Sequence, residues 1–206
     1  MDPSPSLIIR LHSSQQQAAA GVLSRAFFND PLIRYYLPDP ARRERVLPYI
    51  MRVCVRYCLF YGQVDTTPGR DGMACWLPPG HTAMTLLGLL RAALGVLPPN
   101  LGWEAFRRIR QVEPMIDRIH HACVPGPHWY LMVLGVEPAR QGQGTGGRLI
   151  APRLAQARAT GLPCYLETMT ELDVAFYRKH GFKVVFETEM QPGGLHVWMM
   201  LKLPEE

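Results

Sequence analysis

The hydrophobic residues of this chain follow two patterns, and each change from one to the other marks a predicted element. Short apolar runs between turn residues indicate strands at 7–12, 62–67 and 72–77, and the turn-like PGRDG makes the last two a hairpin. Apolar residues at helical spacing indicate one helix that ends at NDP (29–31) and a long helix over 40–62.

Between residues 82 and 122 the pattern predicts two more helices, split at PPN (98–100). The first covers TAMTLLGLLRAALGVL (82–97), the most apolar segment of the chain. It is only 16 residues long and contains Arg91, so it is too short to span a bilayer. A core helix, a dimer face and the wall of an apolar substrate pocket remain alternatives for it.

The C-terminal part of the chain is typical of a β-α-β unit followed by a helix and a hairpin. The predicted elements are a strand at 128–137, a helix to about 160, a strand at 163–168, a helix at 171–180, and strands at 182–190 and 196–203. No repeat or linker interrupts the chain, so we expect one mixed α/β domain over 1–206.

Composition and charge narrow the function classes. The 206 residues are 48% apolar and 19% charged, as in an ordinary globular protein. The net charge is +5, and the densest basic cluster, PARRERV (40–46), indicates a solvated helix face. Nucleic-acid binding needs a basic stripe interleaved with aromatic residues, so no nucleic-acid partner is expected. An anionic cofactor or substrate suits this modest positive charge.

Cysteine and histidine patterns predict neither a disulfide framework nor a metal site. The five cysteines are odd in number and have no C-x-x-C pair. His120, His121 and His128 also lack ligand spacing with neighbouring acids. MDPSPSL has neither the basic nor the apolar region of a signal peptide. We therefore expect no metal, no membrane association and a cytoplasmic protein that is a monomer or homodimer.

The loop QGQGTGG (141–147) contains four glycines and joins a predicted strand to a predicted helix. Backbone N–H groups at a helix N-terminus, with no Cβ atoms in the way, can close on a pyrophosphate. A glycine turn that merely connects the two elements is the alternative. Four glycines exceed what such a turn requires, so the loop favours a phosphate site.

Two other phosphate motifs fit this loop poorly. A P-loop needs lysine and then a hydroxyl residue after its last glycine, where this chain has Arg148 and Leu149. The dinucleotide fingerprint G-x-G-x-x-G is matched literally, with Glu167 where a ribose-binding acid would lie. However, residues 137–141 separate the strand from the loop, and the helix and hairpin after Glu167 cannot complete a doubly wound sheet.

The loop and its flanks resemble the GNAT acyltransferase superfamily, whose pattern is V-x-P followed by [QR]-x-x-G-x-[GA]. The matching residues are VEP (136–138) and QGQGTG (141–146). Because WYLMVLGVEP, LIAPRL, PCYLET and AFYRKHGF also match, residues 129–206 resemble the puromycin N-acetyltransferase group in particular, and the likeness is looser before 128. The resemblance implies an α/β GNAT fold: a mixed central sheet with a splayed strand pair and flanking helices, plus a two-helix insert at about 82–122.

The resemblance also implies acetyl-CoA as co-substrate and suggests how it is held. The strand residues Leu134, Gly135 and Val136 would pair with the pantetheine arm. The pyrophosphate would be bound by Gln141, Gly142, Gln143, Gly144, Thr145, Gly146 and Gly147. Family members often have asparagine near Asp173, and aspartate keeps the acceptor but loses the amide donor. Asp173 is therefore expected to be a weak cofactor contact.

Two residues are candidates for the chemistry of acetyl transfer. Tyr177, in FYRKHGF, matches the family's general-acid tyrosine, and a phenol with a reference pKa of about 10 can protonate a departing thiolate. The alternative is a half-buried tyrosine on an amphipathic helix. Glu167 ends an apolar strand, so its pKa could be raised enough for it to accept the amine proton. A hydrogen-bonded structural acid is an equal alternative for Glu167.

The acceptor site is predicted from the first half of the chain. Asn29 and Asp30 lie where the first helix breaks, a place where GNAT proteins often meet substrate, and Asp30 could pair with a cationic amine. Trp76 could wall the pocket, although a core tryptophan is the alternative.

These residues together predict N-acetylation of a small-molecule primary amine, with an antibiotic or other xenobiotic as one candidate. No cysteine is placed as an acyl carrier, which favours direct transfer in a ternary complex. A protein or peptide N-acetyltransferase is one alternative, and the apolar insert disfavours it because it should narrow the groove that a peptide needs. A CoA-binding module without catalysis is the other, and the presence of both Tyr177 and Glu167 disfavours it.

Overall fold

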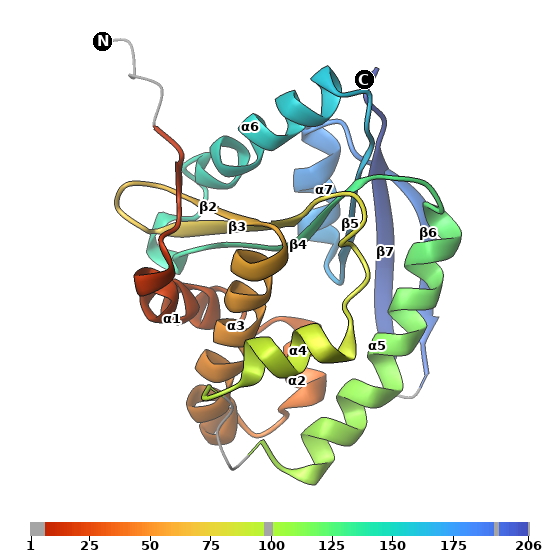
Figure 1. Cartoon of the computed structure of the whole chain (residues 1–206). Helices are drawn as coiled ribbons and strands as arrows, with labels where there is room; N and C mark the ends of the chain where they lie inside the picture. The colour runs from red at the N-terminus through yellow and green to blue at the C-terminus, as the bar shows by residue number, and fades with distance from the viewer. Residues whose placement is uncertain (1–6, 97–100, 192–193, 206) are drawn as a thin grey trace.

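A computed structural model describes residues 7–96, 101–191 and 194–205, and the predicted helix break at 98–100 lies outside them. The strands form one sheet in the order β1-β2-β3-β4-β5-β7-β6, with helices on both faces (Figure 1). The strands are β1 (Ile9–Arg10), β2 (Gln63–Thr66), β3 (Gly72–Leu77), β4 (Trp129–Val136), β5 (Cys164–Thr168), β6 (Lys183–Met190) and β7 (Leu195–Lys202). The α-helices are α1 (Gln16–Ala26), α2 (Pro31–Tyr36), α3 (Pro40–Tyr61), α4 (Leu86–Ala93), α5 (Trp103–Cys123), α6 (Thr145–Ala159) and α7 (Glu171–Lys179).

Helix α2 is the one α-helix that the sequence pattern does not predict. Helix α1 ends at Ala26, before the NDP break, and the break starts α2, because the side chain of Asp30 accepts hydrogen bonds from the backbone N–H groups of Leu32 (2.9 Å) and Ile33 (3.1 Å). Pro31 occupies the first helical position, where its missing N–H costs nothing.

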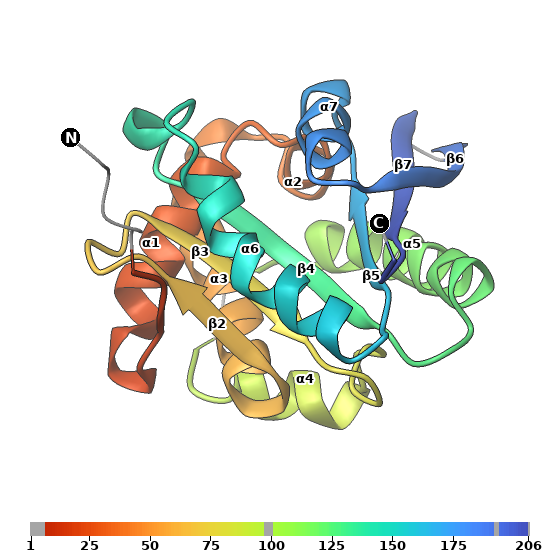
Figure 2. The same ribbon diagram turned by 90° about the horizontal axis from the view of Figure 1, so that it is seen from above.

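The sheet is covered on both faces, and the two core clusters follow the alternation of strand residues. On β3, Met73 and Cys75 belong to the cluster with α1 and α3, whereas Ala74 and Trp76 belong to the cluster with α6. Figure 2 shows α6 lying across β3 and β4 on the opposite face of the sheet from α1 and α3.

Strands β4 and β5 separate soon after they begin. Their parallel pairing consists of Trp129 with Cys164 and Tyr130 with Tyr165. Beyond this point β4 continues along β3 and β5 continues along β7, so the two strands diverge (Figure 2). This divergence confirms the predicted splayed strand pair and the mixed α/β fold.

The insert between β3 and β4 places α5 between α2 and β6, since α5 packs against both. Side-chain hydrogen bonds tie α5 to α2. Arg108 Nη1 donates to the backbone oxygen of Tyr35 (3.0 Å), and the Tyr36 hydroxyl donates to Glu113 (2.6 Å). The insert therefore forms a wall beside the β6–β7 hairpin (Figure 1).

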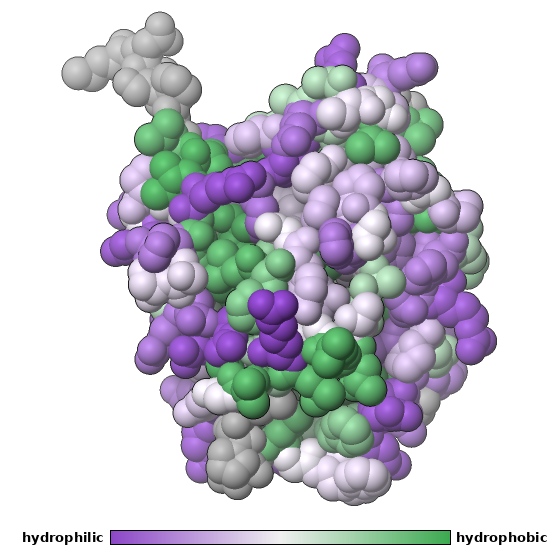
Figure 3. Space-filling view, in the orientation of Figure 1, coloured by the Kyte–Doolittle hydropathy of each residue, from purple (hydrophilic) through white to green (hydrophobic). Residues whose placement is uncertain are grey.

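Helix α4 packs on α3 but presents most of its leucines to solvent. Leu86, Leu87, Leu90 and Leu94 are 60–77% exposed. They form part of the apolar patch in the lower half of Figure 3. This exposure excludes the core-helix alternative for the segment 82–97. Among the described residues, no helix is both long and apolar enough to cross a membrane.

Candidate functional site

The glycine loop opens directly onto the N-terminus of α6. Gly142 and Gly144 both have φ of +74°, a left-handed conformation that favours glycine. A Cβ at Gly142 would meet no heavy atom within 4 Å, so the space beside it is open. The cap residue Gly144 supplies no side-chain hydrogen bond to the first N–H groups of α6. These uncapped donors and the helix dipole suit a pyrophosphate, which fits the predicted use of the loop.

Gly146 and Gly147 have a different physical reason to be glycine. A Cβ at Gly146 would lie 3.2 Å from Phe176 Cζ, and one at Gly147 would lie 2.7 Å from His180 Cε1. Their lack of side chains therefore lets α6 approach α7 closely. The sequence argument assigned all four glycines to phosphate binding, whereas packing against α7 accounts for these two.

Polar side chains of the loop and of the first turn of α6 form hydrogen bonds with the loop and with the strand before it. Arg148 donates to the backbone oxygen of Gln143 (2.9 Å) and to Thr145 Oγ1 (2.8 Å), which places a guanidinium beside the loop. Gln141 donates to the oxygen of Val136 (3.0 Å). Sequence reasoning used Arg148 only to reject a P-loop, although a basic residue in the first helical turn after the glycines was a signal for an anion site.

Leu134, Gly135 and Val136 lie on the part of β4 that has left β5. Their backbone pairs with β3 on one side. In the described part of the chain, no strand pairs with their other edge. A Cβ at Gly135 would lie 2.7 Å from Leu23 Cδ2, so this glycine permits close packing of α1. The open edge can bind an extended amide-containing arm by strand-like hydrogen bonds.

Glu167 lies on β5 at the divergence and is buried, with 7% of its side chain exposed. Its Oε1 accepts no hydrogen bond and lies 3.5 Å from His120 Nδ1 of α5. Burial raises the pKa of Glu167 to about 8; nearby Tyr130 and Tyr165 lower it in part. A carboxyl group with this pKa can exchange a proton near neutral pH, as a general base must.

Tyr177 lies in the core cluster on the other face of the sheet. It is buried with Leu166 and packs edge-on against Phe182, with ring centroids 5.6 Å apart. Burial raises the pKa of its phenol above the usual range, so the hydroxyl remains a proton donor. Strand alternation places Glu167 on the face of Tyr165, opposite Leu166 and Tyr177. The two predicted catalytic residues therefore lie on opposite faces of the sheet, and their catalytic roles stay predictions.

Asp173 has a structural role that the sequence did not reveal. Its backbone N–H donates to Thr170 Oγ1 (3.1 Å), and its carboxylate accepts from the hydroxyls of Thr170 (2.6 Å) and Thr168 (3.1 Å). This reciprocal cap begins α7 and accounts for an aspartate at this position. Its contact with the cofactor stays a prediction.

Three carboxyl groups from separate elements, Asp30, Glu113 and Glu167, are close enough to one another or to a shared neighbour, Tyr36, to interact electrostatically. Asp30 uses Oδ1 to cap α2, and burial raises its pKa to about 6. Burial also raises the pKa of Glu113, and its charge acts on Glu167. Asn29, in contrast, is exposed. Sequence reasoning missed Glu113, although an acid beside the buried Val112 on an amphipathic helix was a signal.

Trp76 does not line the site. Its side chain is 0% exposed and lies in the cluster beneath α6, which agrees with the core alternative rather than a pocket wall.

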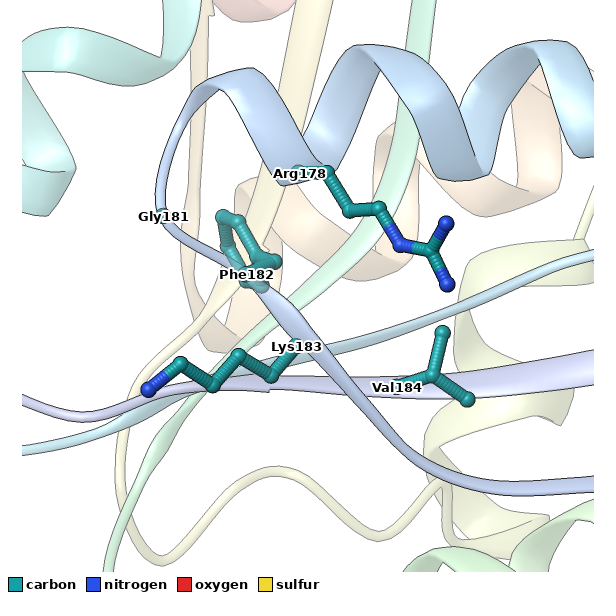
Figure 4. Close-up of a pocket in the computed structure, with 5 residues that line it drawn as sticks. All are labelled: Arg178, Gly181, Phe182, Lys183 and Val184. Atoms are coloured by element: carbon teal, nitrogen blue, oxygen red, sulfur yellow. The ribbon is translucent and has the colours of Figure 1, made fainter.

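Shallow surface pockets lie elsewhere. One is lined by Arg178, Gly181, Phe182, Lys183 and Val184, at the end of α7 and the start of β6 (Figure 4), and it contains none of the predicted site residues. In the described residues, no group of three or more His, Cys, Asp or Glu side chains could hold a metal ion.

Comparisons with known proteins agree with this geometry. Residues 113–184 match the family model described as an acetyltransferase (GNAT) domain, which spans the end of α5, β4, the loop, α6, β5 and α7. An uncharacterized N-acetyltransferase of Schizosaccharomyces pombe is 25% identical over 185 residues, covering 84% of this chain and 72% of that protein.

Solved structures share the fold at low identity. A Corynebacterium glutamicum structure, described as histone acetyltransferase HPA2 and related acetyltransferase, has a TM-score of 0.66 at 19% identity and covers 96% of this chain and 95% of its own. The polyamine N-acetyltransferase of Drosophila melanogaster has a TM-score of 0.62 at 15% identity and covers 96% and 99%. The family-model match over residues 113–184, the N-acetyltransferase relative and the splayed strands thus agree in indicating an acetyltransferase of the GNAT type, and the solved structures share its fold.

Proposed function

We propose that this enzyme transfers the acetyl group of acetyl-CoA directly to the primary amine of a small cationic molecule. The observation that carries the proposal is a set of three carboxyl groups with raised pKa values: Asp30 and Glu113, which are half-buried, and Glu167, whose side chain is 7% exposed. The described groups whose charges act on them are acids, tyrosines and Cys123, and none of these is a lysine or arginine. A ligand ammonium group would supply the missing positive charge.

Each predicted residue has a role in this transfer. Bound acetyl-CoA supplies an activated thioester. The loop and the uncapped N-terminus of α6 hold its pyrophosphate, and the free edge of Leu134 and Val136 binds its amide-containing arm. Glu167 accepts a proton from the acceptor amine, and Tyr177 donates one to the departing sulfur. Asp30, whose Oδ1 caps α2, orients the ammonium group before it is deprotonated.

The position of α5 supports a small acceptor over a protein. Helix α5 fills the space between α2 and β6 and is fixed there by the bonds of Arg108 and Glu113. A peptide strand would have to displace it. The D. melanogaster structural neighbour is a polyamine N-acetyltransferase, and an Aedes aegypti neighbour is an arylalkylamine N-acetyltransferase. Both names are consistent with a small amine here.

A thiol-release assay tests the proposal. The purified chain is incubated with acetyl-CoA and one candidate amine at a time, and the free CoA that is released is measured. The candidates are diamines, arylalkylamines, primary amines that carry no second charge, and lysine-containing peptides. We expect turnover with small cationic amines and little with peptides. Turnover with peptides alone would favour the protein acetyltransferase. Acetyl-CoA binding without turnover on any amine would favour the non-catalytic module.

A further inference from the structure

Helix α4 turns its smallest residues toward the protein and its large apolar residues toward solvent. Gly88 and Ala92 are buried, and a Cβ at Gly88 would lie 2.8 Å from Tyr57 Cε2 of α3. The opposite side of the helix and its C-terminal cap carry leucines that are 60–77% exposed, and we call them the leucine face: Leu86, Leu87, Leu90 and Leu94. A helix that only serves the fold buries such side chains, so the leucine face indicates an interaction site.

The charged residues beside the leucine face are arginines. Arg91 of α4 and Arg56 of α3 both place their guanidinium groups over the ring of Phe60, 4.7 Å and 5.6 Å from its centroid. Phe60 is itself 43% exposed. Figure 3 shows strongly hydrophilic residues directly beside the apolar patch. The stretches 45–61 and 82–96 contain arginines but no aspartate or glutamate, so this surface is apolar and basic.

The positive charge of this surface is not neutralised within the described part of the chain. There, the ion pairs of arginine are Arg25 with Glu137 and Arg153 with Asp65, and neither Arg56 nor Arg91 is in one. An arginine can lay its apolar stem along apolar surface while its guanidinium group reaches outward. The leucine face is therefore bordered by cations that can bind an anionic partner.

A second copy of the chain suits this surface poorly. A two-fold dimer brings the same patch of both chains together. The leucines would pack on each other, but Arg56 and Arg91 of both chains would also meet, with no acid in either stretch to pair with them. An anionic membrane surface, in contrast, offers an apolar phase to the leucines and phosphate groups to the arginines.

We propose that the leucine face, together with Phe60, Arg56 and Arg91, docks on the surface of a membrane that contains anionic lipids. Helix α4 lies in the plane of the interface, with its leucines at the acyl boundary and the guanidinium groups at the headgroup phosphates. This mode needs neither a spanning helix nor a leader segment, so it revises the expectation of no membrane association. Because Glu167 and Tyr177 lie on neither α3 nor α4, docking is independent of the proposed function.

Co-sedimentation with lipid vesicles tests the proposal on the full chain. The protein is mixed with vesicles of phosphatidylcholine alone, or with vesicles that also contain phosphatidylglycerol, and the bound fraction is measured at low and high salt. We expect binding to the anionic vesicles that weakens as the salt concentration rises, and weaker binding to phosphatidylcholine alone. No binding to the anionic vesicles would overturn the proposal.

Leu87→Ser and Leu172→Ser form a matched pair of variants. Each leucine is the second residue of its helix, and the two are 77% and 81% exposed, but Leu172 is on α7. We expect Leu87→Ser to weaken vesicle binding by about tenfold or more, because one leucine no longer enters the apolar phase. Leu172→Ser should bind as wild type does. Equal vesicle binding by the two variants would contradict docking through the leucine face.

Arg91→Gln and Arg158→Gln test the contribution of charge in the same way. Both arginines are exposed, and Arg158 is near the end of α6, on the opposite face of the sheet from α3 (Figure 2). We expect Arg91→Gln to bind the anionic vesicles about fivefold more weakly and Arg158→Gln to bind them as wild type does. An equal loss in both variants would mean that net charge, and not this surface, attracts the vesicles.

Analytical ultracentrifugation decides between the membrane and a second copy. We expect Leu87→Ser to leave the sedimentation of the protein unchanged, because the leucine face is not a contact between chains. A wild-type dimer that Leu87→Ser dissociates, together with no vesicle binding by the wild-type chain, would overturn the proposal and assign the leucine face to a second copy. None of these measurements uses acetyl transfer, so a failure of the proposed function would leave them valid.

Discussion

Burial acts on both predicted catalytic side chains, with opposite consequences for chemistry. It raises the pKa of Tyr177 above its usual range and that of Glu167 to about 8. The phenol therefore stays protonated and ready to donate, whereas the carboxyl group changes charge near neutral pH. The same loss of solvation therefore leaves Tyr177 as a proton donor and Glu167 as a group that can accept a proton. The apolar neighbours of Glu167 in sequence were enough to predict a raised pKa.

Replacing Tyr177 by phenylalanine tests the acid. The substitution removes one hydroxyl from a ring packed against Phe182, so folding should change little. We expect kcat to fall by about 10²–10⁴-fold with nearly unchanged acetyl-CoA affinity, because the hydroxyl acts mainly in the transition state. Steady-state kinetics and a binding titration measure the two quantities. Near-wild-type turnover would remove Tyr177 from the mechanism.

Glu167→Gln should also change stability with pH. The folded-state pKa of about 8 lies above the ordinary value of 4.5, so the folded state binds more protons between these values and wild-type stability falls as the pH rises through that window. Glutamine cannot ionise. We expect the melting temperature of Glu167→Gln, relative to wild type, to be higher at pH 9 than at pH 5. An equal difference at both pH values would mean that Glu167 is not perturbed in the folded protein.

At the scale of elements, α6 offers a matched pair of glycines. Gly142, in the loop before it, has φ of +74°, and Gly161, after its C-terminus, has φ of +65°. A Cβ at either position would meet nothing within 4 Å. Replacing either by alanine should therefore cost a similar roughly 1–2 kcal/mol of stability, from the left-handed backbone alone.

Only the loop glycine should affect the co-substrate. We expect Gly142→Ala to weaken acetyl-CoA binding by roughly tenfold or more, about 1.4 kcal/mol, because its Cβ enters the space proposed for the pyrophosphate. Gly161→Ala should bind acetyl-CoA as wild type does, and isothermal titration of both variants provides the comparison. Equal affinities would show that the loop is only a turn.

The elements themselves were largely predictable from the sequence, but their partners were not. The spacing of apolar residues predicted β4, α6, β5 and α7. It did not predict α2, because the NDP break was interpreted only as the end of a helix, whereas a proline can also occupy the first position of a new one. The close approach of Gly147 to His180 depends on how α6 and α7 pack, which no local pattern records.

At the scale of the whole molecule, the site depends on contacts between distant segments. Helix α5 brings Glu113 and His120 to Glu167, and Asp30, at the start of α2, shares the neighbour Tyr36 with Glu113. Sequence motifs predicted Asp30 and Glu167 one at a time. They could not predict His120 or Glu113, because those residues meet the site only through the packing of an insert. Trp76 was ambiguous for the same reason, since only the fold decides which face of β3 it occupies.

Ligand-induced stabilisation tests the molecule as a whole. A ligand that binds only the folded state raises the free energy of unfolding by RT ln(1 + [L]/Kd), which is about 2.7 kcal/mol at a concentration of 100 Kd. We expect acetyl-CoA to raise the melting temperature, and NAD and ATP to leave it unchanged, because the loop lacks the P-loop lysine and β4 diverges from β5 where a doubly wound sheet would continue. Thermal shift measurements at matched ligand concentrations make the comparison. A tenfold weaker affinity in Gly142→Ala should remove about half of this stabilisation, whereas Gly161→Ala should keep all of it, so the experiment also locates the binding. A shift with NAD and none with acetyl-CoA would mean that the glycines serve a dinucleotide, and the assignment of the opening between β4 and β5 to the pantetheine arm would be wrong.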